Sequence, residues 1–204
     1  MTRVDVLVFG PHPDDIEIGL GGTVAVHVDD GYRVGLCDLT RGELGSNGTI
    51  DERLSEAQAA AEELGVLWRE NAGWPDGGIG REKSTFQIRA AAEIIRLTRP
   101  SVVGVPYSCD RHPDHEAACG VLKQAVFYAG LRRYAADGKP WKPDWTCEYF
   151  INDIDTPSFV VDVSDSYDRK VRALSCHRSQ FQPKGNNPVE TRLTGSNFLR
   201  MIEA

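Results

Sequence analysis

The chain has 204 residues, 41% of them hydrophobic, and a formal charge of −7 because 30 Asp and Glu outnumber 23 Lys and Arg. This length suits one compact domain with a sizeable core. No basic run would neutralise the phosphates of a nucleic acid, and no stretch approaches the roughly 20 apolar residues of a membrane span. The start of the chain has no apolar signal core, and the five scattered cysteines form no C-x-x-C pair, as expected for reduced thiols. We therefore expect a soluble cytoplasmic protein with neither a nucleic-acid nor a membrane partner.

Strand and helix patterns alternate along the first two thirds of the chain. Apolar runs predict strands at 4–9, 33–39, 67–71 and 102–105, and helical periodicity predicts helices at 16–29, 52–64 and 86–97, with a further helix opening at 112–115. Gly65 and Pro100 predict where the second and third helices end. This alternation indicates an α/β, Rossmann-like doubly wound domain, with a mostly parallel sheet and helices on both faces.

After Gly130 the rhythm loosens. Strands are expected at 146–151 and 159–163, a helix at 165–179 and a polar loop at 182–194. There is no internal repeat or low-complexity linker, so residues 1–204 are expected to form a single domain. The sequence ends just after the expected start of another helix, which predicts a C-terminal continuation.

Two short polar clusters each follow a predicted strand. Pro11-His12-Pro13-Asp14-Asp15 comes after the first strand, and His112-Pro113-Asp114-His115 after the fourth. Ligands bind beyond the carboxyl ends of the strands in open α/β sheets, so the sheet can bring together clusters about a hundred positions apart. Zinc accepts imidazole nitrogen and carboxylate oxygen, and a catalytic zinc needs three such ligands and one open position. The two clusters therefore predict a catalytic metal site.

The ligand set expected from this chemistry is His12, Asp15 and His115. Asp14 is expected to be the general base, because zinc lowers the pKa of water toward about 7 and a neighbouring carboxylate can complete its activation. Zn²⁺ is the expected cofactor, although other divalent metals suit such ligands.

The remaining members of the second cluster fit proton transfer. His112 is expected to face the substrate as an imidazolium that stabilises an oxyanion and protonates a leaving amine. Asp114 is expected to orient the His112 ring. This inventory fits hydrolysis of an amide bond.

Several ordered motifs carry a family resemblance. They are His12-Pro13-Asp14-Asp15 with the following 16–23 stretch, Thr40-Arg41-Gly42-Glu43, Arg53-x-x-Glu56-Ala57, Pro75-Asp76-Gly77 and the 110–115 stretch. In this order they resemble the PIG-L/LmbE family of zinc-dependent N-acetylglucosamine deacetylases. The resemblance spans residues 4 to about 130, with weaker likeness at Ser179-Gln180-Phe181.

Within that family, the 45–49 stretch and Asp110-Arg111 look most like the bacillithiol-pathway deacetylases, which remove acetate from N-acetylglucosaminyl malate. The resemblance implies the same ligands, base and acid as above. It also implies that Arg53 contacts the substrate, with Arg111 as a second cation. A malate aglycone carries two carboxylates, which the planar guanidinium fork binds.

Other functions remain open at this point. From the same resemblance come a thiol-conjugate amidase and a deacetylase of another aminosugar, and from a different class comes a non-catalytic metal- or sugar-binding module. Against the last stand Asp14 and His112, which a structural site would not require. The substrate is expected to be a small aminosugar compound, and the resemblance leaves a homo-oligomer open.

Three further features bear on the site. Gly19-x-Gly21-Gly22 with Asp38 resembles a dinucleotide fingerprint, but its glycines fall inside a predicted helix rather than at the turn, so helix packing is the better explanation. Trp74 is the tryptophan expected near the pocket. Some relatives offer a C-terminal tyrosine as an oxyanion donor, and here Asn197 or Phe198 stands at that position.

Overall fold

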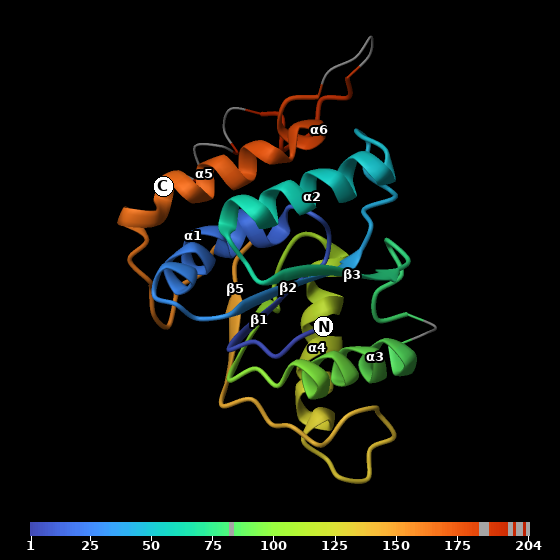
Figure 1. The fold of residues 1–204 in the computed structure, drawn as a ribbon. Helices are drawn as coiled ribbons and strands as arrows, with labels where there is room; N and C mark the ends of the chain where they lie inside the picture. Colours follow the sequence, from blue (N-terminus) through green and yellow to red (C-terminus); the bar gives the residue numbers. More distant parts are fainter. Residues whose placement is uncertain (82–83, 184–187, 196–197, 199–201, 203–204) are drawn as a thin grey trace.

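The computed structural model describes residues 1–81, 84–183, 188–195, 198 and 202, and its centre is a parallel sheet (Figure 1). The sheet has five strands in the order β3-β2-β1-β4-β5. They are β1 (Val6–Gly10), β2 (Val34–Thr40), β3 (Trp68–Trp74), β4 (Val102–Pro106) and β5 (Trp145–Tyr149). Every neighbouring pair is parallel, which confirms the predicted α/β fold class.

Helices cover both faces of the sheet (Figure 1). One layer contains α1 (Asp15–Asp29), α2 (Ile50–Leu64) and α5 (Tyr167–Cys176), and the other contains α3 (Ser84–Thr98) and α4 (Pro113–Ala129). Alternate side chains of β1 enter the two cores, since Leu7 and Phe9 pack with the α3–α4 side and Val8 with the α1–α5 side. The strands buried on both sides explain the continuous apolar runs of the sequence.

Local signals fix the ends of α2. The Thr49 side chain accepts a hydrogen bond from the Glu52 backbone N–H, and the Glu52 carboxylate accepts one from the Thr49 N–H. This capping box begins the helix at Ile50 rather than at Glu52 as expected. Gly65 ends it with φ 74°, as the sequence predicts.

The glycines of α1 serve packing. A Cβ on Gly19 would lie 2.3 Å from the Phe150 carbonyl oxygen, and one on Gly22 would lie 2.9 Å from Val163 Cβ. Both helix turns therefore approach other parts of the chain closely. The contacts confirm that packing, not nucleotide binding, accounts for this glycine pattern.

Two predictions for the last third of the chain are wrong. Residues 159–163 form no strand, because the chain leaves the sheet after β5 and crosses α1, where Val163 contacts Gly22. The helix expected at 165–179 is divided into the 3₁₀ turn η1 (Ser164–Ser166), α5 and α6 (Arg178–Phe181). The break at His177 has φ −78° and ψ 57° and buries the imidazole, whose Nε2 lies 3.4 Å from Glu17 Oε2.

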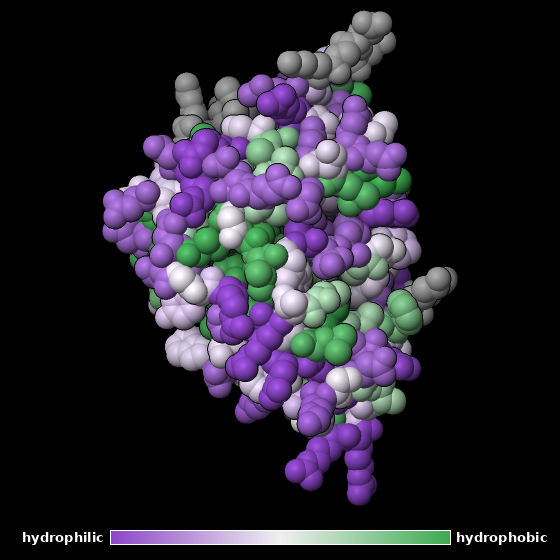
Figure 2. Space-filling model, in the orientation of Figure 1, coloured by the Kyte–Doolittle hydropathy of each residue, from purple (hydrophilic) through white to green (hydrophobic). Residues whose placement is uncertain are grey.

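The described chain has a mostly polar face (Figure 2), and several side chains singled out from the sequence are buried. No helix among the described residues is long and apolar enough to cross a membrane. The face in Figure 2 is mostly hydrophilic, with apolar side chains gathered near its middle. Cys37 and Cys119 are buried, whereas Cys109 is exposed, and none of the five cysteines forms a disulfide. Trp74, the last residue of β3, is buried in the core on the α3–α4 side and does not line the cavity at the strand ends, contrary to the expectation.

Candidate active site

The two sequence clusters meet beyond the carboxyl ends of β1 and β4. Chain order reverses between these adjacent strands, because β1 continues outward to β2 on one side and β4 to β5 on the other. Such a reversal opens a crevice where α/β proteins bind ligands. A cavity of about 520 Å³ lies there. Its lining includes every site residue predicted from the sequence: His12, Asp14, Asp15, Arg53, Arg111, His112, Asp114 and His115.

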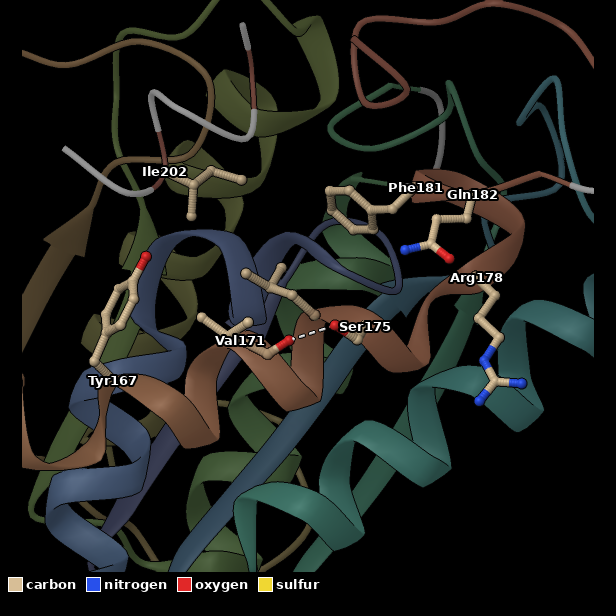
Figure 3. Close-up of a pocket in the computed structure, with 8 residues that line it drawn as sticks. Tyr167, Val171, Ser175, Arg178, Phe181, Gln182 and Ile202 are labelled. Carbon is tan, nitrogen blue, oxygen red and sulfur yellow. Dashed lines mark hydrogen bonds between the residues drawn. The ribbon is translucent and has the colours of Figure 1, made fainter. Parts of the chain in front are cut away.

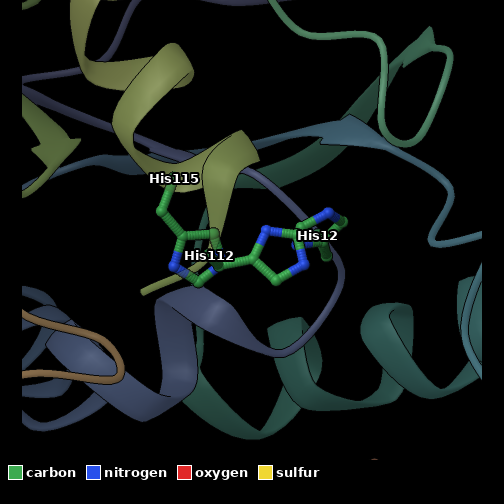
Figure 4. A group of neighbouring side chains, drawn as sticks. All are labelled: His12, His112 and His115. Carbon is green, nitrogen blue, oxygen red and sulfur yellow. The ribbon is translucent and has the colours of Figure 1, made fainter. Parts of the chain in front are cut away.

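Three imidazole rings stand together at the base of this cavity (Figure 4). The ring centroids of His12 and His112 are 4.8 Å apart, those of His112 and His115 are 4.7 Å apart, and those of His12 and His115 are 5.5 Å apart. One nitrogen from each ring lies within 4.8 Å of the others, so the group could hold a metal ion.

Asp15 lies between two of these rings. Its Oδ2 is 3.1 Å from His12 Nδ1 and 3.2 Å from His115 Nε2. In a tetrahedral zinc site with bonds of 2.0–2.2 Å, neighbouring ligand atoms are separated by about 3.4 Å. The two distances to Asp15 are close to that separation. Among the described residues, the groups whose ligand atoms all lie within 4.8 Å of one another are His12, His112 and His115, and His12, Asp76 and Asp114, so the ligand set of His12, Asp15 and His115 stays a prediction.

The opposite nitrogen of each ring faces another carboxylate. His12 Nε2 lies 3.2 Å from Asp76 Oδ1 and 3.5 Å from Asp114 Oδ2, and it has no well-formed hydrogen bond within the described chain. His115 Nδ1 lies 3.2 Å from Asp110 Oδ1. Metal-binding histidines usually donate their outer N–H to such a group, which fixes the ring and its tautomer.

Four carboxylates line the cavity, and they make a positive charge favourable there: Asp14, Asp15, Asp76 and Asp114. Burial opposes the charged form of His12, but Asp114, Asp15 and Asp76 raise its pKa well above its usual value. Burial likewise opposes charging of His115, yet Asp15 and Asp110 raise its pKa to about 9. The same carboxylates would stabilise a bound cation.

Asp110 joins the loop before α4 to the segment after β5. Its carboxylate accepts hydrogen bonds from the His112 backbone N–H at 2.8 Å, from the Asn152 backbone N–H at 3.0 Å and from Asn152 Nδ2 at 3.1 Å. Burial raises the pKa of Asp110, but the His115 contact and these donors outweigh it and keep the carboxyl ionised. The sequence included Asp110 only as part of a motif, and nothing in the sequence indicated Asn152.

Asp114 acts on a different ring from the one expected. Its backbone N–H, not its carboxylate, contacts His112, at 3.2 Å from Nδ1. The carboxylate instead accepts a hydrogen bond from the Gly77 N–H at 2.7 Å and faces His12. Because Asp114 opens a helix, its side chain turns back toward the strand ends, away from the His112 ring.

Asp14 has an unusual backbone. It is the residue before α1 and has φ 113° and ψ −28°, a conformation that costs a non-glycine residue about 1 to 3 kcal/mol. Burial raises the pKa of its carboxyl to about 6, opposed by the charge of Arg53. Asp14 is therefore a buried carboxyl whose pKa is raised toward neutral pH, a direction that suits proton transfer.

His112 caps the N-terminus of α4. Its Nδ1 accepts the Asp114 N–H, so the proton of the neutral ring lies on Nε2. Burial and the neighbouring His12 and His115 lower the pKa of His112. This direction favours a neutral ring, in contrast to the imidazolium expected from the sequence.

The two predicted arginines differ in exposure. Arg53 is buried, and its guanidinium donates to the carbonyls of Gly42 and Pro13. Arg111 is exposed in the lining of the cavity. Sequence reasoning missed Arg192 and included Gln180 only in the weak likeness at Ser179-Gln180-Phe181, and both residues also line the cavity. Of the two candidate C-terminal residues, Phe198 is buried in the core, and Asn197 lies outside the described residues.

A second pocket of about 170 Å³ lies along α5 and α6 (Figure 3). Its lining residues are Tyr167, Val171, Leu174, Ser175, Arg178, Phe181, Gln182 and Ile202. This lining contains no histidine, carboxylate or thiol. The larger cavity is therefore where the candidate chemistry of the described chain is gathered.

Two known deacetylases are similar to this chain in sequence. Diacetylchitobiose deacetylase of Thermococcus kodakarensis is 33% identical over 86% of this chain and 70% of its own length. The probable N-acetyl-alpha-D-glucosaminyl L-malate deacetylase 2 of Bacillus subtilis is 29% identical over 90% of each chain.

Two solved structures extend the comparison. A conserved protein of Thermus thermophilus superposes with a TM-score of 0.84 at 42% identity, over 88% of this chain and 80% of its own. The 4-carboxy-2-hydroxymuconate hydratase of Pseudomonas putida gives a TM-score of 0.71 at 25% identity, over 86% and 78% of the two chains. The family model described as PIG-L, GlcNAc-PI de-N-acetylase, matches residues 7–126, more than half of the 204. The chain belongs to the PIG-L family.

Proposed function

We propose that this protein is a zinc-dependent hydrolase that removes the N-acetyl group of an N-acetylglucosaminide. The observation that carries the proposal is the convergence of His12 Nδ1, Asp15 Oδ2 and His115 Nε2 beside the buried carboxyl of Asp14. The match to the PIG-L family and the similarity to named deacetylases support the reaction class.

In this proposal His12, Asp15 and His115 hold the zinc, and Asp110 with Asp76 and Asp114 fixes the two histidine rings. A bound zinc ion supplies the Lewis acidity that activates water and polarises the amide carbonyl. The separate outer carboxylates keep one nitrogen of each ring turned toward Asp15.

The proton transfers are assigned to the chain's own side chains. Asp14 is ionised at neutral pH and accepts a proton from the attacking water. His112 donates a hydrogen bond from Nε2 to the carbonyl oxygen, where negative charge develops. Because the neutral His112 ring has no acidic proton to give, Asp14 returns its proton to the leaving amine, which departs while acetate is formed.

The proposed substrate is N-acetylglucosaminyl malate. The similarity to the Bacillus subtilis relative supports this choice, as does exposed Arg111 in the lining of the cavity, because a guanidinium pairs with the malate carboxylates. A deacetylase of another aminosugar is the second candidate, supported by the 33% identity to diacetylchitobiose deacetylase.

Acetate release from N-acetylglucosaminyl malate and from diacetylchitobiose tests the proposal. We expect turnover only after zinc is added to chelator-treated protein, with the higher kcat/KM on the malate conjugate. A higher kcat/KM on diacetylchitobiose would show that the preferred substrate is not the malate conjugate but another aminosugar. Zinc-independent turnover, or hydration of 4-carboxy-2-hydroxymuconate in place of acetate release, would overturn the proposed reaction.

A further inference from the structure

We propose that Arg53 is a positioning residue for Asp14 and does not bind the substrate anion. This inference rests on the proposed function for its kinetic consequence, but its structural basis is independent of the substrate. The relevant contacts join α2 to the turn before α1.

The position of Arg53 is fixed by the start of α2. Its backbone N–H donates to the Thr49 carbonyl at 3.0 Å, in the turn that the Thr49–Glu52 capping box holds in place. From there the side chain reaches the Pro13–Asp14 turn and is only 6% exposed. A side chain held at its base and buried along its length has one well-defined orientation.

The guanidinium is already bonded to the protein at both ends. NH1 donates to the Gly42 carbonyl oxygen at 2.8 Å. NH2 donates to the Pro13 carbonyl oxygen at 2.8 Å and to Asp14 Oδ2 at 3.4 Å. Nε has no hydrogen-bond partner among the described residues, but it is buried away from solvent. Both two-pronged faces of a guanidinium include an NH2 hydrogen, so bidentate capture of a substrate carboxylate would have to break the contact of NH2 with Pro13 or with Asp14.

The Arg53 hydrogen bond to the Pro13 carbonyl constrains the peptide that precedes Asp14. Asp14 has φ 113°, a conformation that a non-glycine residue retains only where its surroundings enforce it. Arg53 holds the carbonyl just before this residue, and the Thr40 backbone N–H and Oγ1 hold the Pro11 carbonyl, each at 3.0 Å. The turn that carries the base is thus tied to α2 and to the end of β2.

The loop that follows β2 contains Gly42, whose missing side chain leaves space for the Arg53 guanidinium. Gly42 has φ +69°, and a Cβ there would lie 1.9 Å from Arg53 NH1. Any other residue would push the guanidinium away from Pro13. The Gly42 backbone therefore forms part of the binding site for the Arg53 guanidinium.

These contacts predict a kinetic signature. Loss of the Arg53 guanidinium, with its bonds to Gly42 and Pro13, should displace Asp14. We expect kcat to fall about tenfold to a hundredfold, as it does when reacting groups are slightly displaced. KM should change by less than about twofold, because ground-state binding is not removed. The loss should be equal for a neutral and an anionic aglycone.

The test compares Arg53→Lys, which keeps the charge but loses the fork, with Arg96→Lys. Arg96 is a matched control because it is also buried and donates to backbone carbonyls, those of Ala129, Leu131 and Ala136, on the far side of the sheet. Each variant is assayed on the methyl glycoside of N-acetylglucosamine and on N-acetylglucosaminyl malate, and the crystal structure of each is solved. We expect a fall in kcat on both substrates, and a changed Asp14 backbone, only for Arg53→Lys.

Two results would overturn the inference. One is a rise in KM confined to the malate conjugate with kcat retained, which would indicate a substrate contact. The other is an Asp14 backbone and carboxylate left unchanged in the Arg53→Lys crystal structure. If the wild-type protein turns over neither substrate, the proposed function fails, and the crystal comparison alone decides the role of Arg53.

Discussion

Each histidine that faces Asp15 has a carboxylate against its other ring nitrogen. For His115 that carboxylate is Asp110, which accepts three further hydrogen bonds and is therefore itself held still. The proton on Nδ1 leaves the Nε2 lone pair free to bind a metal. The orientation of a ligand is thus decided by a residue that would not touch the ion.

Asp110→Asn tests this arrangement. The amide cannot accept on both sides as a carboxylate does, so we expect zinc affinity to fall about 10- to 100-fold. Competition with a chromophoric chelator measures the affinity, and the nitrogen shifts of His115 in metal-free protein report its protonation, since Asp110 helps to raise its pKa to about 9. Asp155→Asn is the control, because Asp155 is an exposed carboxylate bonded to Tyr107 outside this site. Equal affinity in the Asp110 variant and the wild type would contradict the prediction.

Asp14→Asn tests the base. The amide cannot accept a proton, so kcat for acetate release should fall by about 10² to 10⁴ while zinc affinity stays near the wild-type value. Exposed Asp51, in the first turn of α2, provides the control as Asp51→Asn. An Asp14 variant as active as the wild type would show that the base is elsewhere.

Much of the residue-level site could be predicted from the sequence, because its members lie next to strand ends. His12 and His115 came together as the parallel order of β1 and β4 requires. Asn152 and Gln180 could not be found in this way, because their place depends on the path taken after β5. The partner of Asp114 could not be predicted either, since it depends on the direction of one side chain at a helix start.

At the scale of the elements, two helix glycines face opposite surroundings. Gly19 in α1 lies against the Phe150 carbonyl, whereas a Cβ on exposed Gly120 in α4 would meet nothing within 4 Å. Both are helix-interior glycines in the sequence, and only the packing separates them.

Gly19→Ala and Gly120→Ala should therefore act in opposite directions. We expect Gly19→Ala to lower the free energy of unfolding by about 1 to 3 kcal/mol through overpacking. Gly120→Ala should raise it by about 0.4 to 1 kcal/mol, because alanine loses less conformational freedom on folding. Urea unfolding measures both, and destabilisation by both variants would show that Gly120 has a packing role.

The elements predicted wrongly share a cause. Residues 159–163 have the apolar, β-branched composition of a strand, but composition does not reveal whether a sheet edge is available to them. The helical pattern through 165–179 continues past His177, where burial of the imidazole beside Glu17 interrupts the helix. Both outcomes depend on tertiary contacts with α1.

At the scale of the whole molecule, a metal at the reversal of strand order would link the two halves of the sheet. Its predicted ligands follow β1 and β4, so the ion would bind the folded state and not the unfolded chain. The free energy of metal binding then adds to the free energy of unfolding.

Zinc should therefore raise the melting temperature. At a free concentration of 100 times Kd, the gain is about 2.7 kcal/mol, or roughly 5 to 10 °C for a domain of this size. Calorimetry of chelator-treated protein with and without zinc measures it, and Asp15→Asn should lose most of the shift. The same melting temperature with and without zinc would contradict binding at this site.

The path of the chain after β5 has an evolutionary consequence. The side chains assigned to chemistry fall within residues 7–126, the part matched by the family model, whereas Gln180, Thr191, Arg192 and Leu193 form another wall of the same cavity from beyond it. Substitutions in that wall can reshape the entrance without disturbing the sheet or the metal ligands. Related enzymes can thus act on substrates with different aglycones and still catalyse the same reaction.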